Sequence, residues 1–189
     1  MYPRCVVFGI GNESRGDDAV GPLLLERLRF ALERSPVYSS FTFISDFQLQ
    51  IEHTLDLENQ DIALFIDAGV PPALLNSEPF SLKVIAPSTQ PLGMTHALLP
   101  TELMGIASDY FLKLEKSSKD LKSSSTKDAS TNIRALPTPY VLCVRGYQFE
   151  LGTTLSPECK VNSDLAFEAL MLWIKNNADT PLGDLACTN

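Results

Sequence analysis

Hydrophobic residues gather in short runs along the chain, separated by longer amphipathic stretches. One run, residues 4–9, ends in glycine, and another, residues 61–67, is closed by an acid. Short apolar runs bounded by turn residues are typical of buried strands. We therefore predict strands over these two runs, and β-rich segments predict three further strands over residues 41–45, 80–86 and 140–144.

Helical periodicity appears between these strands. Over residues 19–32, large apolar residues recur three and four positions apart, which places them on one face of a helix. Residues 48–57 predict a short helix, a helix begins near Thr101 and ends near residue 115, and residues 162–175 predict a closing helix. The alternation predicts an α/β fold: a single three-layer domain with a mostly parallel twisted sheet of about five strands and helices on both faces.

The 189 residues suit one domain. Residues 116–131 are rich in Ser, Lys and Asp and cannot contribute to a core. We therefore expect a flexible insertion at residues 116–137 and a loose tail from about residue 178.

Composition and charge narrow the range of partners. A hydrophobic fraction of 44% with 20% charged residues is typical of soluble globular proteins, and no apolar run reaches the roughly 18 residues that span a bilayer. The first apolar run is too short for a signal peptide, so we expect a cytoplasmic protein. The formal net charge of −8 repels phosphate backbones, so neither nucleic acid nor membrane is an expected partner.

The cysteines form no metal-binding or redox motif. They contain no CxxC pair, and two of them lie in apolar runs; the four are Cys5, Cys143, Cys159 and Cys187. We expect buried thiols.

The glycine-rich turn after the first strand resembles a dinucleotide-binding fingerprint only in part. Gly9 and Gly11 match GxGxxG, but Ser14 stands at the third glycine. Asp17 and Asp18 follow, where they would repel a pyrophosphate. The two acids also suit a simple role in capping the next helix.

Three candidate ligands come from three separate segments. Asp18 follows the first strand, Asp67 closes the strand expected beside it, and His96 lies in a loop before a helix. Because sites in parallel sheets gather beyond the carboxyl ends of strands, we expect these side chains to meet. Two carboxylates and one imidazole would suit Ni, Mn, Fe or Zn. Their spacing alone is not diagnostic, and a turn-forming role remains open for Asp67.

Other sequence features point to no rival catalytic centre. There is no GxSxG, HExxH or P-loop motif. The second histidine, His53, lies in a predicted helix, where we expect a packing or surface role.

Four segments together resemble the hydrogenase maturation proteases. GIGNESRGDDAVGPLLLERL resembles the N-terminal signature of that family, which pairs a GxGN turn with two acids and a following Gly. LFIDAG resembles its second motif, THALLP its third, and FQLQIEHTLDL the connecting helix of some members. Order and approximate spacing agree over residues 4 to about 115.

The resemblance implies a metal-dependent peptidase reaction. It implies cleavage of a C-terminal peptide from the precursor of a nickel-iron hydrogenase large subunit, after nickel insertion. Asp18, Asp67 and His96 would contact the nickel, which belongs to the substrate precursor rather than to the protease. Asp17 is a further catalytic candidate, because it or Asp18 could orient the attacking water.

Several points stay open at the level of sequence. A metallocentre chaperone that binds the same nickel without cleaving is the main alternative, and a nucleotide-binding domain is a weaker one. We expect a monomer. Glu13 and Arg15 stand where some relatives have apolar residues, and they would alter which precursor fits.

Overall fold

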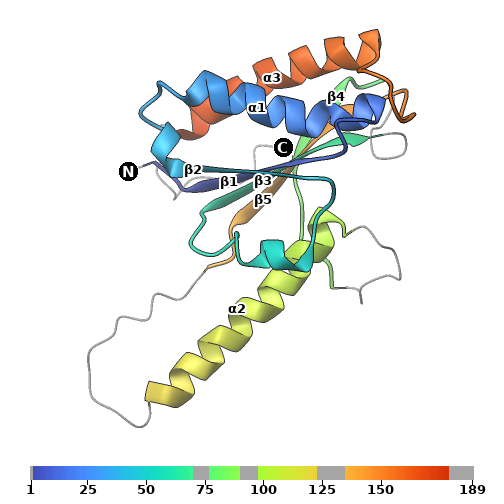
Figure 1. Cartoon of the computed structure of the whole chain (residues 1–189). Helices are drawn as coiled ribbons and strands as arrows, with labels where there is room; N and C mark the ends of the chain where they lie inside the picture. The colour runs from blue at the N-terminus through green and yellow to red at the C-terminus, as the bar shows by residue number, and fades with distance from the viewer. Residues whose placement is uncertain (1, 70–76, 90–97, 123–134, 179–189) are drawn as a thin grey trace.

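Figure 1 shows the computed structural model of the chain, which describes residues 2–69, 77–89, 98–122 and 135–178. A five-stranded sheet lies at its centre, in the order β2-β1-β3-β5-β4. The first four of these strands are parallel, and β4 runs antiparallel to β5. The strands are β1 (Cys5–Ile10), β2 (Phe41–Asp46), β3 (Ile62–Gly69), β4 (Phe80–Val84) and β5 (Thr138–Arg145).

Helices cover both faces of the sheet, as the alternation of elements predicts (Figure 1). On one face lie α1 (Val20–Leu32) and α3 (Pro157–Ala178). On the other lie α2 (Pro100–Lys122) and the short 3-10 turn η3 (Ile51–Thr54). Two further 3-10 turns are η1 (Gly16–Ala19), before α1, and η2 (Tyr38–Ser40), before β2. The predicted α/β fold with a mostly parallel sheet is confirmed.

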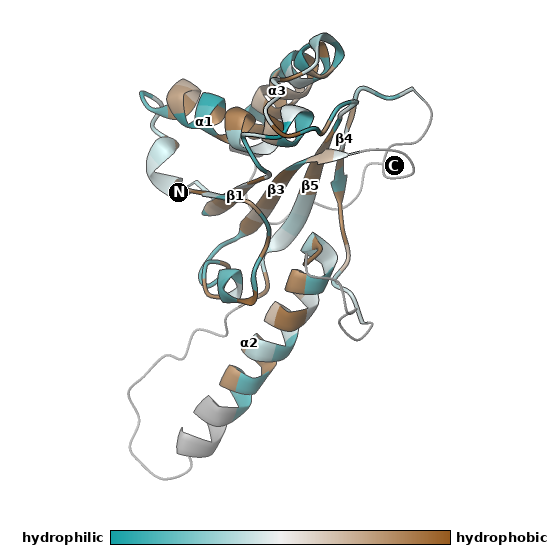
Figure 2. Ribbon diagram, turned by 45° about the vertical axis from the view of Figure 1, so that its right-hand side comes forward, coloured by the Kyte–Doolittle hydropathy of each residue, from teal (hydrophilic) through white to brown (hydrophobic). Residues whose placement is uncertain are grey.

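Strand β1 shows why the central strands read as unbroken apolar runs. All of its residues are buried. Val7 packs with α1 and α3, whereas Val6 and Phe8 pack toward α2 and η3. Figure 2 shows these hydrophobic strands in brown between the two helical layers. A strand covered on both sides has no position for a polar residue, which removes the alternation expected of a half-exposed strand.

Three helix boundaries differ from the prediction. Residues 48–57 do not form the predicted α-helix. Residues 51–54 form a 3-10 helix and residues 55–57 a turn, because N–H groups such as those of His53 and Asp56 donate to carbonyls three positions back. Helix α3 begins at Pro157, before the predicted residue 162. Ser156 accepts a hydrogen bond from the Cys159 N–H, and proline suits the first turn of a helix because it lacks an N–H group.

Helix α2 continues to Lys122, past the predicted end near residue 115. The first residues of the expected insertion at 116–137 are therefore helical. Residues 123–134 and 179–189 lie outside the described structure, so the flexible insertion and the loose tail stay predictions.

In the described ranges, no helix has the length and hydrophobicity to cross a membrane.

Candidate active site at the carboxyl ends of the parallel strands

The loop after β1 brings Asp18 to the carboxyl edge of the sheet. Its backbone turns at Gly11, where φ is 138°, a conformation that residues with a Cβ rarely adopt. A Cβ on Gly11 would also collide with the carbonyl oxygen of Asp18. The Asn12 N–H donates a hydrogen bond of 2.9 Å to Oδ2 of the half-buried Asp18. The glycine thus allows the loop to fold directly onto Asp18.

Helix α1 begins in close contact with the sheet because position 21 is glycine. A Cβ on Gly21 would collide with the carbonyl oxygen of Ile10 and approach that of Ile66 to 2.7 Å. The start of α1 therefore lies beside the last residue of β1 and beside Ile66 in the middle of β3. The close contact between helix and strand that a third glycine at position 14 would provide in a dinucleotide site is made here by Gly21.

Asp67 reaches the same edge from β3. Its neighbour Ile66 pairs with Gly9 of β1, and Asp67 itself pairs with Cys143 of β5. Burial raises the pKa of Asp67 to about 7; the negative charge of Asp18 acts in the same direction, and a hydrogen bond from the Ala68 N–H opposes it. Asp67 and the loop that carries Asp18 thus lie at the same edge of the sheet.

Asp18 and Asp67 are two of the three residues that the sequence suggests as metal ligands. Among the described residues, no group of three or more His, Cys, Asp and Glu side chains is arranged to hold a metal ion. The predicted third ligand, His96, lies outside the described residues. The chain is next described at Leu98, which forms an antiparallel bridge with Leu49, three residues beyond the end of β2. This bridge also lies toward the carboxyl edge of the sheet.

Asp17 has a very different environment from its neighbour Asp18. Its side chain is fully buried. It accepts four hydrogen bonds of 2.6 to 3.1 Å, from the N–H groups of Tyr147, Gln148 and Ser156 and from the Ser156 hydroxyl. Burial by itself would raise the pKa of Asp17, but the hydrogen bonds from Ser156, Tyr147 and Gln148 outweigh it and hold that pKa below its ordinary value.

The structure therefore corrects both roles that the sequence suggests for Asp17. A buried carboxylate with its acceptor sites filled is poorly placed to activate water, so we assign it a structural role. It also does not cap a helix, since neither η1 nor α1 has a side-chain hydrogen bond at its first turn. Asp17 instead ties η1 to the connection between β5 and α3.

A groove of about 410 Å³ opens beside the Asp18 loop. Its walls are residues 11–14, which follow β1, and residues 45–47, at the end of β2. Glu13 and Asp46 give the groove an acidic lining. Asp46 was not singled out in the sequence, although it closes a β-rich run just as Asp67 does, and it pairs with Ile10 of β1. The same strand-end argument would have found it.

His53 is buried beside this groove. Its ring packs edge-on against Phe8, with ring centroids 5.4 Å apart, so the expected packing role is confirmed. Its Nδ1 accepts a hydrogen bond of 2.9 Å from the Gln50 N–H, which leaves the proton on Nε2. Nε2 lies 3.5 Å from Oδ2 of Asp46. This partner, which the sequence does not reveal, helps to hold Asp46 in the groove wall.

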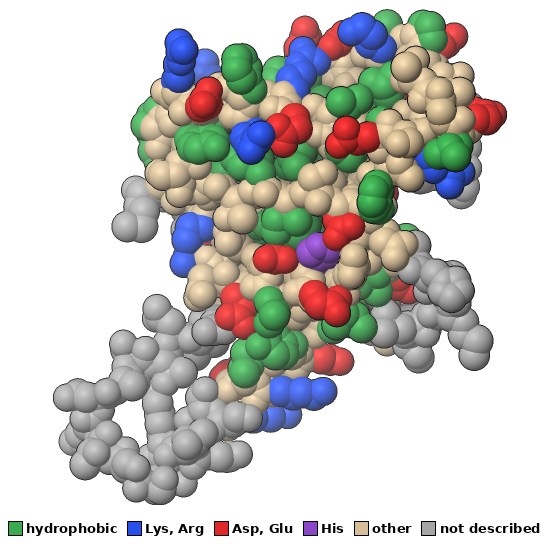
Figure 3. Space-filling view, in the orientation of Figure 1, with side chains coloured by type: hydrophobic (Ala, Val, Ile, Leu, Met, Phe, Trp, Pro, Cys, Tyr) green, Lys and Arg blue, Asp and Glu red, His purple; other side chains and the backbone are tan. Residues whose placement is uncertain are grey.

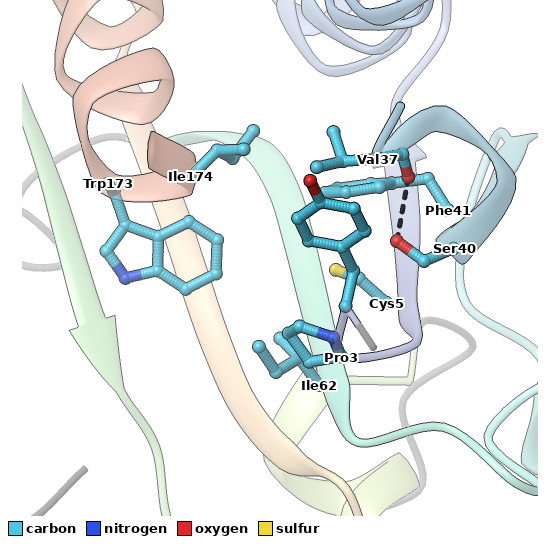
Figure 4. A pocket seen from close by; sticks show the side chains of 9 residues that line it. Pro3, Cys5, Val37, Ser40, Phe41, Ile62, Trp173 and Ile174 are labelled. Atoms are coloured by element: carbon cyan, nitrogen blue, oxygen red, sulfur yellow. Dashed lines mark hydrogen bonds between the residues drawn. The ribbon is translucent and has the colours of Figure 1, made fainter. Parts of the chain in front are cut away.

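A second pocket lies at the opposite end of the sheet and is almost entirely apolar (Figure 4). Its volume of about 20 Å³ holds little more than one water molecule. The hydroxyl of Ser40, which lines this pocket, is already bonded to the Val37 carbonyl. The lining residues are Tyr2, Pro3, Cys5, Val37, Ser40, Phe41, Ile62, Trp173 and Ile174. None of these lining residues is Asp, Glu, His, Lys or Arg.

The cysteines in the described structure are buried and unpaired, as expected: Cys5, Cys143 and Cys159. Burial raises the pKa of the Cys5 thiol, and it raises those of Cys143 and Cys159 to about 11 and about 12. Thiols that stay protonated at neutral pH are poor nucleophiles. Cys187 lies outside the described residues.

The sequence matches no protein-family profile and no curated protein. Solved structures do match. The nickel-iron hydrogenase maturation protease HycI from Thermococcus kodakarensis KOD1 superimposes with a TM-score of 0.59 at 18% identity, covering 93% of this chain and 94% of that one. The hydrogenase maturating endopeptidase HybD from E. coli gives a TM-score of 0.55 at 18% identity, covering 92% and 93%.

A third solved structure, the nickel-iron hydrogenase maturation protease HybD from Thermococcus kodakarensis, gives a TM-score of 0.51 at 15% identity. The match covers 90% of this chain and 99% of that chain. The likeness therefore extends over nearly the whole of each molecule. At these identities it establishes the fold.

Proposed function

We propose that this chain, which has the fold of the nickel-iron hydrogenase maturation proteases, is an endopeptidase that removes the C-terminal extension of a hydrogenase large-subunit precursor after nickel insertion. The observation that carries the proposal is the pair Asp18 and Asp67. Neither carboxylate has a salt-bridge partner within the described parts of the chain. Both occupy the positions that the sequence resemblance assigns to nickel contacts.

Repulsion between the two carboxylates supports a role in binding a cation of the substrate. The raised pKa of Asp67 reflects both its burial and the charge of Asp18. A divalent ion placed between them would favour the ionised form of both. Carboxylate oxygens with an imidazole from His96 are suitable ligands for nickel. These three ligands leave coordination positions of the nickel free for ligands of the precursor. The nickel would therefore bridge precursor and protease, and recognition of the precursor would depend on the metal being present.

The groove beside Asp18 supports a peptide substrate over a nucleotide. Its space of about 410 Å³ lies next to the proposed nickel contacts. Its acidic residues, Glu13 and Asp46, would repel the phosphates of a nucleotide. The precursor segment that carries the scissile bond would enter here.

A mass measurement tests the proposal. Purified protein is mixed with a nickel-loaded large-subunit precursor, and the mass of the precursor is followed over time. We expect loss of the C-terminal peptide with the wild-type protein and intact precursor with Asp18→Asn, Asp67→Asn and His96→Ala. Glu168→Gln, an exposed acid on α3, is the matched control and should cleave normally.

Two outcomes would contradict the assignment. Wild-type cleavage rates in all three site variants would remove the proposed ligands from the reaction. A stable complex with a precursor of unchanged mass would instead identify a metallocentre-binding chaperone.

A further inference from the structure

The segment that joins β2 to β3 has two apolar faces, and only one of them is covered. Its inner face buries Leu49, His53 and Leu57 against the sheet and α2. Its outer face exposes Phe47, Ile51 and Leu55, at 70%, 56% and 58% of their surface. On each face, the apolar or buried residues recur every four positions along the chain. An ordinary surface turn would carry polar residues at the outer positions.

Leu99, at the start of α2, extends this exposed face. It is 58% exposed, and the bridge between Leu49 and Leu98 brings it beside the same segment. We call Phe47, Ile51, Leu55 and Leu99 the exposed apolar patch. Phe47 also lines the groove beside Asp18, so the patch continues into the candidate active site. Contiguous exposed apolar side chains of this kind mark sites of interaction.

Acidic residues surround the patch. Glu52 follows Ile51, Asp56 follows Leu55, and Glu13 lines the groove opposite Phe47. Residues 35–82 contain seven Asp and Glu residues and no Lys or Arg. Figure 3 shows red acidic and green hydrophobic side chains gathered around the purple side chain of His53, over η3 and the start of α2. We call these acidic residues, which lie among and beside the exposed apolar side chains, the acidic rim.

We propose that the exposed apolar patch and its acidic rim dock a surface of the precursor that has an apolar centre and basic residues around it. This inference rests on the proposed function, since it names where the substrate of that reaction binds. Charge complementarity selects this occupant. A second copy of the chain would bring two acidic rims together, and nucleic acid or an anionic membrane would be repelled by them.

The position of the patch sets its effect on the reaction. It adjoins the groove but contains neither Asp18 nor Asp67, so it contributes to binding of the precursor without touching the scissile bond. Loss of such an interaction weakens binding in the ground state and transition state alike, which raises KM and leaves kcat unchanged.

A binding titration with matched controls tests the inference. The probe is the nickel-loaded large-subunit precursor, and its Kd is measured by calorimetry with the protein carrying Ile51→Ser and Leu55→Ser together. We expect Kd to rise by about tenfold or more, because buried anchors carry most of the affinity of an interface. Leu172→Ser, equally exposed at 60% but on α3 across the sheet, should leave Kd unchanged.

The acidic rim is tested separately by Glu52→Lys with Asp56→Lys, compared with Glu168→Lys on α3. We expect the rim variant to weaken binding and to abolish the loss of affinity that added salt causes in the wild-type protein. Circular dichroism of each variant confirms that the fold is kept.

The outcomes separate the docking inference from the proposed function. Cleavage by the wild-type protein together with an unchanged Kd in the Ile51 and Leu55 variant would overturn docking and leave the protease assignment standing. Binding that depends on the patch without any cleavage would support docking and overturn the protease assignment. A wild-type protein that binds no precursor would overturn both.

Discussion

A carboxyl group that titrates near neutral pH makes stability depend on pH in an uncommon direction. The pKa of Asp67 is raised from 3.8 to about 7 in the folded protein. Because the folded pKa lies above the unfolded one, the stabilising contribution of the protonated group is complete below about pH 4 and is lost as pH rises to about 7. The folded state is therefore strained electrostatically under the conditions in which the site would bind a cation.

Asp67→Asn should relieve this strain. Relative to the wild-type protein, we expect its free energy of unfolding to increase by up to about 4 kcal/mol at pH 8 and by little at pH 4.5. Urea unfolding at the two pH values measures the difference. Equal effects at both pH values would show that Asp67 titrates as an ordinary, solvated carboxyl group.

Asp17 should show the opposite behaviour. Its carboxylate accepts hydrogen bonds from Tyr147, Gln148 and Ser156, and its pKa is lowered. We expect Asp17→Asn to destabilise the fold by roughly 2 to 5 kcal/mol at pH 7, because an amide NH2 would face backbone donors. The effect should shrink as pH falls through the lowered pKa of Asp17, because the native carboxylate then becomes protonated.

Asp18→Asn is the matched comparison, since the half-buried Asp18 accepts one hydrogen bond, from Asn12, among the described residues. It should change stability by less than about 1 kcal/mol while stopping cleavage. A larger loss of stability in Asp18→Asn than in Asp17→Asn would reverse the two roles.

The sequence could place Asp18 and Asp67 toward one edge of the sheet, because Asp18 follows β1 and Asp67 lies near the end of the neighbouring strand β3. The sequence could not reveal that Asp17 is buried and structural whereas Asp18 stays half-buried at the candidate site. Their difference is set by residues about 130 positions away in the connection between β5 and α3, whose backbone donors fill the acceptor sites of Asp17 alone. Local patterns contain no information about such distant donors.

At the scale of elements, the contact between α1 and the sheet depends on Gly21. Gly21→Ala would place a methyl group against the carbonyl oxygens of Ile10 and Ile66, and both are backbone atoms of buried strands. We expect a loss of about 2 to 4 kcal/mol, measured by thermal or urea unfolding. Cleavage should fall as well, because displacement of α1 moves η1 and the carboxylate of Asp18.

Gly152→Ala is the control variant for the cost of replacing a glycine where no steric clash results. Gly152 has a positive φ of 82°, but an added Cβ would meet nothing within 4 Å. We expect a cost of only about 1 kcal/mol, from backbone conformation alone. Similar losses in the two variants would mean that close packing of α1 is not what Gly21 provides.

The strands were predictable because burial on both faces leaves continuous apolar runs. The segment between β2 and β3 was harder to predict, since its apolar residues lie on two faces and fit a helical period although it forms 3-10 turns. The start of α3 was missed for a different reason. The Ser156-Pro157 pair is a recognisable helix start, but it lies ahead of the polar cluster at residues 162–164 that suggested a later one.

At the scale of the whole molecule, the candidate site exists because four parallel strands point the same way. The carboxyl ends of β1, β2 and β3 lie at one edge of the sheet, which places Asp18, Asp46 and Asp67 there although they are far apart in the chain. Opposite this edge lies a small apolar pocket. The topology therefore concentrates acidic groups at one end, beside an exposed apolar patch suited to a protein partner.

The dependence of cleavage on nickel tests the central claim most directly. Wild-type protein is incubated with the same large-subunit precursor in nickel-loaded and metal-free form, and the mass of each precursor is measured. Our account predicts that the C-terminal peptide is lost from the nickel-loaded precursor alone. An intact mass for both forms, or equal cleavage of both, would contradict it.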